Sequence, residues 1–568
     1  MASEISSDQF DVIVIGAGIN GAGIARDAAM RGLKVLLLDK GDIGGGTSSW
    51  STRLIHGGLR YLEHGELGLV RESLRERACL MNIAPHLVRP LQILVPIYKH
   101  ARRGVWTIRA GMIAYDVLSF GKSLPPHRML SAVETLQHAP ALNREGLMGA
   151  AVYFDAQVEF AERLVLENAL AAVEHGATVI TYARVDNILV EAGKVCGVEY
   201  SRVQSPTSNV QSQQTTGTAG VSPADRGSLA LREGEHHSAT ARVVINAAGP
   251  WIDQVLGASA PSSSRLIGGT KGSHLIVGPF AGAPGIAIYV EAETDNRPFF
   301  IIPWNGNYLI GTTDIRYDGD LDHVRIETEE IEYLLRETNR VIPKAQLTRA
   351  QILYTYSGVR PLPFVNEKDE PGVPGGAAPL GWKQSITRKH FIRPSPRLDN
   401  LFSIVGGKLT TYRSLAEEAV DLIFKNLGRS MPTCTTDQVA LPGATAQFQG
   451  LGLPELPEAT NHRLSRIYGA RSSAVAALIG DDSSLGDVFD LETGAIAAEV
   501  VFVFKHELAQ TLSDCLLRRT MVGLNSTSGL DAAEPAASIA LKYLGWSASR
   551  VDQEIEAYRK EISGRLYR

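Results

Sequence analysis

The chain has 568 residues, a formal net charge of -5 (56 Lys and Arg against 61 Asp and Glu) and 44% hydrophobic residues. At roughly 100–200 residues per domain, this length predicts about three domains and excludes a minimal binding module. The near balance of charge excludes a protein that coats nucleic acid with its whole surface.

The composition also bears on the cellular compartment. The four cysteines lie far apart without a CxxC pair or nearby histidine spacing, which predicts reduced thiols and no metal site. The N-terminus, MASEISSDQF, is polar and acidic, unlike a signal peptide, and no apolar run approaches the ~18 residues of a membrane span. We therefore expect a cytoplasmic chain that does not cross a membrane.

The strongest local pattern lies at the start of the chain. The apolar run FDVIVI at 10–15 precedes GAGING at 16–21, a helical stretch to Met30 and a second apolar run, KVLLL, at 34–38. Strand, glycine turn, helix and strand in this order predict a Rossmann-type dinucleotide site.

Each motif residue has a separate expected role. Gly16 permits the tight turn, Gly18 lets backbone N–H groups approach a pyrophosphate, and Gly21 lets the helix pack on the strand. Asp39, at the end of the second strand, is placed to accept hydrogen bonds from a ribose 2′-OH, which disfavours a 2′-phosphate.

After Asp39 the pattern of a nicotinamide dehydrogenase ends. A glycine- and hydroxyl-rich loop, GDIGGGTSS at 41–49, stands where a helix is usual, so another part of the protein is expected to lie against it. Thr47, Ser48 and Ser49 are expected to contact the bound dinucleotide by hydroxyl and backbone groups, although such runs are more often ordinary loops.

The rest of the chain predicts further elements in order. Helices are expected at 66–81 and 159–175, and strands at 177–184, 241–248 and 401–405. Apolar and polar residues alternate over 270–320, which predicts a mixed or antiparallel sheet that faces the substrate. The Ser/Thr/Gln-rich segment 203–230 is expected to be a surface insertion. From Pro432 onward the chain is predicted to be mostly helical, including Ala495 to Arg519.

A second glycine turn, GGKLTT at 406–411, follows the strand at 401–405 and opens a helix. Its free N–H groups and dipole suit negative charge on a bound ligand. The alternative is a turn that only links strand to helix.

Several motifs in order carry a family resemblance. They are GAGING (16–21), GTSSWSTRLIHGGLRYLEHGE (46–66), NAAGPW (246–251), GTKGSHL (269–275), FFIIPW (299–304), GTTD (311–314), SGVRPL (357–362), GGKLTTYR (406–413) and LLRRT (516–520). Together they resemble the respiratory FAD-dependent glycerol-3-phosphate dehydrogenases over nearly the whole chain.

The resemblance implies an α/β fold: an FAD-binding Rossmann-like domain of the glutathione-reductase/amino-acid-oxidase type, a mixed-sheet substrate domain and a C-terminal helical domain. The expected boundaries are 1–85, 150–255 and 355–430 for the FAD domain, 86–149 and 256–354 for the substrate domain, and 431–568 for the helical cap. The implied reaction oxidises sn-glycerol 3-phosphate to dihydroxyacetone phosphate, and FAD passes the electrons to membrane quinone. A homodimer on the cytoplasmic face of the inner membrane is expected.

The resemblance also assigns site residues. The expected FAD contacts are Gly16, Gly18, Gly21, Asp39, Lys40, Thr47, Ser48, Ser49, Leu54, His56, Gly57, Gly58, Val185, Ala248, Gly249, Gly407, Lys408, Leu409, Thr410 and Thr411.

A phosphate dianion needs converging cations, and arginine suits it because its planar guanidinium makes paired contacts. Matching the family motifs by position nominates Arg60, Arg360, Arg388 and Lys408, with Tyr61 as a neutral partner. Any one of these arginines taken alone would more often be a surface or ion-pair residue. Lys389 stands where an acid is expected, which puts the pairing of Arg388 in doubt.

Oxidation of an alcohol needs a base for the hydroxyl proton. His274 is the candidate base and Arg360 the candidate partner of the alkoxide, whereas His56 is a rival base beside the flavin. A structural role for His274 is the alternative. Trp50 and Arg53 depart from the family pattern, in which smaller or lysine side chains are expected at these positions.

The segment from Tyr98 to Leu130 is basic and partly apolar. Its six Lys/Arg and one acid, Asp116, alternate with Trp106, Ile108, Met112, Ile113 and Phe120. The basic residues are Lys99, Arg102, Arg103, Arg109, Lys122 and Arg128. This pattern suits peripheral contact with an anionic bilayer, and an ordinary packed helix is the alternative.

Other functions remain open at this point. An oxidase that reduces oxygen to hydrogen peroxide, a related amine or amino-acid oxidase, and a protein in which FAD is only structural all fit the same fold. The candidate phosphate-binding cations argue against the last of these.

Overall fold

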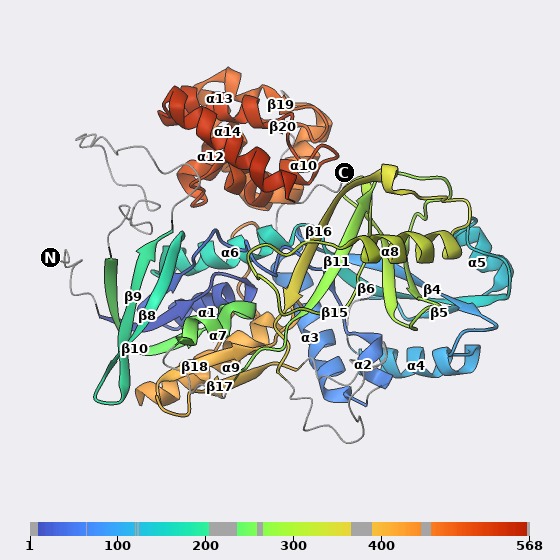
Figure 1. The fold of residues 1–568 in the computed structure, drawn as a ribbon, viewed down its shortest axis with the longest axis horizontal. Helices are drawn as coiled ribbons and strands as arrows, with labels where there is room; N and C mark the ends of the chain where they lie inside the picture. Colours follow the sequence, from blue (N-terminus) through green and yellow to red (C-terminus); the bar gives the residue numbers. More distant parts are fainter. Residues whose placement is uncertain are drawn as a thin grey trace.

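The computed structural model describes residues 9–564 except 64, 120, 122–123, 204–235, 258–264, 365–388 and 445–455, and only the backbone at 60 and 63. Arg388 and almost all of the 203–230 segment lie outside these residues. Figure 1 shows two sheets side by side, with the C-terminal helices lying across them.

The first sheet is the dinucleotide sheet. Its strand order is β17-β18-β10-β1-β2-β7, and β1 is parallel to both β10 and β2. The hairpin of β8 and β9 extends it from β10. Its strands are β1 (Phe10–Ile15), β2 (Val35–Leu38), β7 (Thr178–Ile180), β8 (Ala183–Glu191), β9 (Lys194–Arg202), β10 (His236–Asn246), β17 (Phe391–Pro394) and β18 (Leu401–Val405).

Helix α1 (Ile19–Met30) packs against α6 (Ala161–Glu174) and α9 (Tyr412–Leu427) beside this sheet. The turn before α1 depends on glycine. Gly16 has φ of +103°, and a Cβ atom at Gly21 would lie 1.8 Å from the Gly16 carbonyl oxygen. Only glycine at both positions brings the helix N-terminus this close to the end of β1.

The second sheet is mixed, as predicted. Its order is β15-β11-β14-β13-β12-β4-β6-β3, with β16 on β11 and β5 on β6, and β4 is parallel to β12. The strands are β3 (Leu54–Ile55), β4 (Val88–Tyr98), β5 (Arg128–Ser131), β6 (Leu147–Val158), β11 (Thr270–Val277), β12 (Ala287–Glu291), β13 (Pro298–Trp304), β14 (Asn307–Gly311), β15 (Ile315–Arg316) and β16 (Ile352–Arg360). The accompanying helices are α2 (Leu59–Glu63), α3 (Leu67–Ile83), α4 (Val105–Leu118), α5 (Ala132–His138) and α8 (Thr328–Val341).

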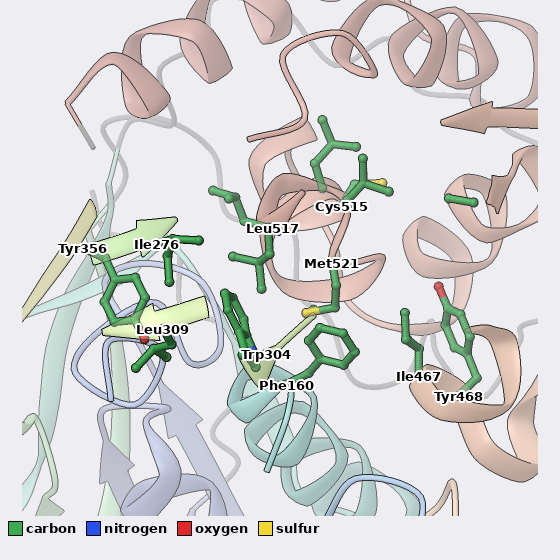
Figure 2. Packing of buried hydrophobic residues seen from close by; sticks show 14 of the residues in the cluster. Phe160, Ile276, Trp304, Leu309, Tyr356, Ile467, Tyr468, Cys515, Leu517 and Met521 are labelled. Atoms are coloured by element: carbon green, nitrogen blue, oxygen red, sulfur yellow. The ribbon is translucent and has the colours of Figure 1, made fainter. Parts of the chain in front are cut away.

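The C-terminal part is helical, with one short hairpin. Its elements are α10 (Glu458–Tyr468), α11 (Ser472–Asp481), β19 (Val488–Asp490), β20 (Ala495–Ile496), α12 (Ala497–His506), a π-helical turn (Asp514–Arg519), α13 (Ala533–Leu544) and α14 (Ala548–Ser563). Its apolar residues share a core with the second sheet: Figure 2 shows Trp304 and Phe160 facing Leu517 and Met521.

Two elements differ from the prediction. The stretch from Ala495 to Arg519 is not one helix, because α12 ends at His506 and Leu508 has φ of +57°. The carboxylate of Glu507 at this break is buried against Arg163. The expected strand 177–184 is divided into β7 and β8 at Tyr182, whose φ is also +57°.

A buried ion pair joins the two sheets. The guanidinium of Arg53 donates two hydrogen bonds of 2.7 Å to the carboxylate of Glu162 at the start of α6. Both side chains are buried, and Arg53 also lies 4.6 Å from the Trp304 ring. Arg53, which departs from the expected lysine, therefore makes a bidentate interaction with the Glu162 carboxylate. A lysine ammonium could not make this paired contact.

We predict that Glu162→Ala destabilises the protein by about 3–5 kcal/mol, because it leaves the Arg53 charge buried without its partner. The thermal unfolding midpoint should fall by several degrees. Glu332→Ala is the control, since Glu332 is 53% exposed and pairs with Arg349 at the surface. Equal midpoints for the two variants would show that the buried pair contributes little.

Candidate active site

A cavity of about 950 Å³ lies where the two sheets and the C-terminal helices meet. It runs from the glycine turn of β1 past the loop 39–53 to strands β11 and β16. Its size is at the upper end of the roughly 300–1,000 Å³ typical of ligand and cofactor pockets.

One end of the cavity has the features of a dinucleotide site. The carboxylate of Asp39 accepts hydrogen bonds from the backbone N–H of Ala17 (2.6 Å) and of Gly41 (2.8 Å). Burial raises the pKa of Asp39, and these two bonds act in the opposite direction. Ser48 Oγ accepts the N–H of Ile19 at 3.0 Å, so the loop 39–53 is fixed to the first turn of α1.

The second glycine turn forms another wall. Gly406 to Thr410 line the cavity before α9 begins, and Asn20 Nδ2 donates to the Gly406 carbonyl at 3.3 Å. Thr410 Oγ1 accepts the backbone N–H of His56 at 3.2 Å. The side-chain oxygen of Asn20 is buried and has no hydrogen-bond partner among the described residues, so a donor on a bound ligand would satisfy it.

His274 lies on β11, fully buried at the cavity wall. Its Nε2 is 3.0 Å from Thr52 Oγ1, and its ring centroid is 4.8 Å from that of Tyr356. Burial, followed by the charges of Arg360 and Arg53, holds the pKa of His274 well below its usual 6.5. The imidazole is therefore neutral at physiological pH and able to accept a proton.

Arg360, at the end of β16, is held close to His274. Its guanidinium donates to Asp314 Oδ1 at 3.2 Å and to Thr312 Oγ1 at 3.0 Å. A Cβ atom at Gly272 would lie 2.2 Å from the Arg360 Nη2 atom, so the glycine of the KGSH motif makes room for this guanidinium.

A second cation, Lys408, also lines the cavity. Lys408 Nζ is 4.1 Å from the centre of the Tyr61 ring and 3.2 Å from Ser73 Oγ. Tyr61 and Lys408 both line the cavity, as do His56, His274 and Arg360. The side chains of Arg60 and Arg388 are not among those described.

Most of the expected cofactor residues line this cavity: Gly16, Gly18, Asp39, Lys40, Thr47, Ser48, Leu54, His56, Gly58, Val185, Ala248, Gly249, Gly407, Lys408, Leu409 and Thr410. Gly21, Ser49, Gly57 and Thr411 do not. Gly21 packs on Gly16, the Ser49 hydroxyl donates to the Gly44 carbonyl, and the Gly57 N–H is bonded to Tyr115. Contact of these four residues with FAD stays a prediction.

Sequence reasoning missed several wall residues, among them Asn20, Thr52, Tyr289, Arg297 and Phe300. Thr52 is one hydroxyl in a run of them, and only the fold singles it out by placing it against His274. Asn20 lies inside the GAGING motif, where a polar side chain before the third glycine was the available signal.

The residues present fit FAD. The cavity is long enough to run from a pyrophosphate turn to a second helix N-terminus, it has a buried acid at its ribose end, and it holds an unsatisfied acceptor at Asn20. Gly16, Gly18, Asp39 and Ser48 would hold the dinucleotide, and Gly406 to Thr410 would face the flavin ring.

Comparison with known proteins agrees with this site. Residues 11–375 match the family model of FAD-dependent oxidoreductases, and residues 434–551 match the model of the C-terminal domain of alpha-glycerophosphate oxidase. The chain is thus an FAD-dependent oxidoreductase and a flavoprotein.

Similar proteins indicate to which group of FAD-dependent oxidoreductases the chain belongs. A glycerol-3-phosphate dehydrogenase from Synechocystis is 44% identical over 98% of this chain and 97% of that one. A D-erythritol 1-phosphate dehydrogenase from Brucella abortus is 36% identical over 92% and 96% of the two chains. The solved structure of a glycerol-3-phosphate dehydrogenase from Bacillus halodurans complexed with FAD has a TM-score of 0.72 and 27% identity, covering 99% and 96%. This chain belongs to the FAD-dependent glycerol-3-phosphate dehydrogenase family.

We predict that Gly272→Ala lowers the rate of substrate oxidation by at least about tenfold with FAD still bound, because the new methyl group displaces the Arg360 guanidinium. The rate is measured as flavin reduction, and bound FAD by absorbance. Gly278→Ala is the control, since nothing lies within 4 Å of a Cβ atom there. An unchanged rate in Gly272→Ala would show that the position of Arg360 is unimportant.

Proposed function

We propose that the chain oxidises sn-glycerol 3-phosphate to dihydroxyacetone phosphate and passes the electrons to a membrane quinone. One observation carries this proposal: neutral His274, Arg360, Tyr61 and Lys408 line the same cavity as the two glycine turns at 16–21 and 406–411. When bound, FAD supplies the hydride acceptor.

In this proposal His274 accepts the proton of the C2 hydroxyl, while the Arg360 guanidinium faces the oxygen that becomes negative. Thr52 is hydrogen-bonded to Nε2, and the other ring nitrogen, Nδ1, is buried. The substrate hydroxyl would therefore replace or share the Thr52 contact at Nε2. His56, the rival base, contacts Thr410 through its backbone N–H.

The phosphate would be bound by Lys408 and by Arg60 and Arg388, with Tyr61 as a neutral donor. Support comes from the position of Lys408 over the Tyr61 ring, since both residues line the cavity. Arg360 is engaged by Asp314 and Thr312 and lies beside His274, which favours the alkoxide over the phosphate as its partner.

The first test is anaerobic mixing of the purified holoprotein with glycerol 3-phosphate. We expect the flavin absorbance near 450 nm to bleach, since the substrate hydride reduces the ring. D-erythritol 1-phosphate and an amino acid are the comparison substrates. Faster bleaching with either one would reassign the substrate, and rapid peroxide release in air would favour the oxidase.

A second prediction concerns the base. His274→Ala should slow flavin reduction by about 10²–10⁴-fold without loss of FAD. His56→Ala is the comparison variant, and a larger loss there would make His56 the base. Both rates are measured by stopped-flow absorbance at saturating substrate.

The pH dependence follows from the lowered pKa of His274. A lowered pKa keeps the imidazole neutral at pH values where an ordinary histidine is half protonated, so the base form persists below pH 6.5. The limiting rate of flavin reduction should therefore be level from about pH 6 to 8. A fall to half the rate near pH 6.5 would contradict this.

Peripheral membrane contact is supported by helix α4. Trp106, Ile113 and Val117 are 78%, 50% and 68% exposed and share one face of the helix, with exposed Arg102 and Arg109 beside them. Met112 faces inward and Arg103 is paired with Glu291, so these two residues are not part of the proposed contact surface. Tyr115 donates to Asp155 and accepts the Gly57 N–H, which fixes α4 to the cavity wall.

We predict that replacing Trp106, Ile113 and Val117 together with Ser abolishes flotation with anionic liposomes, because burial of this apolar face drives binding. Leu491→Ser is the control, as Leu491 is 92% exposed on the C-terminal part. Equal flotation of the two variants would remove α4 as the contact.

Within the described ranges, no helix is both long and apolar enough to cross a bilayer. The homodimer and the cytoplasmic face of the inner membrane remain predictions that sedimentation and cell fractionation would test.

A further inference from the structure

The loop 39–53 is bound from the C-terminal side by two arginines. Asp42 accepts hydrogen bonds from Arg519 at 2.7 and 2.8 Å and from Arg518 at 2.5 Å. All three side chains are buried. Burial alone would raise the pKa of Asp42, but Arg519 and Arg518 hold it below the usual value, so the carboxylate is charged.

A second acid, Asp514, extends this contact to Tyr182, which lies between β7 and β8. Asp514 accepts a 2.5 Å hydrogen bond from the Tyr182 hydroxyl and a 2.8 Å bond from Arg518. The Tyr182 backbone N–H donates to the Gly41 carbonyl at 3.0 Å. Gly41 and Asp42 are thus both connected to the π-helical turn Asp514–Arg519.

The same C-terminal residues form part of the cavity. Thr511, Ser513 and Arg518 line it, together with Glu554 and Glu561 of α14. Asp42 and Tyr182, which these C-terminal residues contact, line the cavity as well, as does Asp39. The C-terminal part therefore closes the end of the cavity that the dinucleotide motif forms.

We propose that Asp42, through Arg518 and Arg519, couples retention of FAD to docking of the C-terminal helices. The inference rests on the placement of FAD in this cavity. Asp42 is a positioning residue, because it holds the loop that carries Ser48 and the N–H of Gly41 against the cofactor end. By linkage, FAD must stabilise the docked arrangement as much as docking strengthens FAD binding.

The first test uses the wild-type chain. Backbone hydrogen exchange is followed for residues 507–524 and for α14, with and without FAD. The proposal predicts slower exchange in both segments when FAD is bound, although the two glycine turns at 16–21 and 406–411 lie in other parts of the chain. Exchange there that is the same with and without FAD would overturn the proposal.

The second test compares two variants by the rate of FAD release on dilution, followed by the recovery of flavin fluorescence. Asp42→Asn keeps the shape but removes the charge, and release should quicken by about tenfold or more. Arg471→Ala is the matched control: it breaks a 2.6 Å pair with buried Glu507 in the same C-terminal part without touching the loop 39–53. Its release rate should stay at the wild-type value.

Equal release rates for Asp42→Asn and the wild type would contradict the proposal, and so would equal acceleration in both variants, since that indicates general loosening. If Asp42→Asn does not fold, the exchange measurement on the wild type still decides. An apoprotein that fails to quench FAD fluorescence would instead refute the placement of the cofactor itself.

Discussion

The loop of residues 39–53 is the constraint on which the site depends, because a buried ion pair holds it at each end. Asp42 is bound by Arg519 and Arg518, and Arg53 is bound by Glu162. A buried charge that loses its partner is costly, so neither end of the loop can move without a large loss of stability. Between these ends the loop meets α1 through Ser48, β16 through Thr47 and β11 through Thr52.

The same constraint sets the electrostatics of the reacting groups. Burial lowers the pKa of His274, the charges of Arg360 and Arg53 lower it further, and each arginine is itself fixed by an acid. A neutral imidazole is therefore present before any substrate arrives, which is the preorganisation that proton abstraction needs. Gly272 and Thr312 limit where the Arg360 guanidinium lies, so in the proposed mechanism three short motifs far apart in sequence would act together on the substrate oxygen.

The sequence predicted the parts whose signal is local. The strand, glycine turn, helix and acid from Phe10 to Asp39 follow from spacing alone, and the alternation after residue 270 indicated the mixed sheet. What could not be predicted were partners across long separations: Asp42 and Arg519 lie 477 residues apart, and neither charge is unusual in its own segment. Ser49 and Gly57 were placed at the cofactor by motif position, but only the fold shows that their polar groups are used within the wall.

The most direct test of the account is single-turnover reduction of the flavin by glycerol 3-phosphate deuterated at C2. If the C2 hydride leaves for the flavin while His274 takes the hydroxyl proton, the deuterated substrate should reduce the flavin more slowly than the ordinary one. His274→Ala should be slow with both substrates while keeping FAD. Flavin reduction at equal rates with the two substrates, or no reduction by either in the wild-type protein, would contradict hydride transfer from C2 at this site.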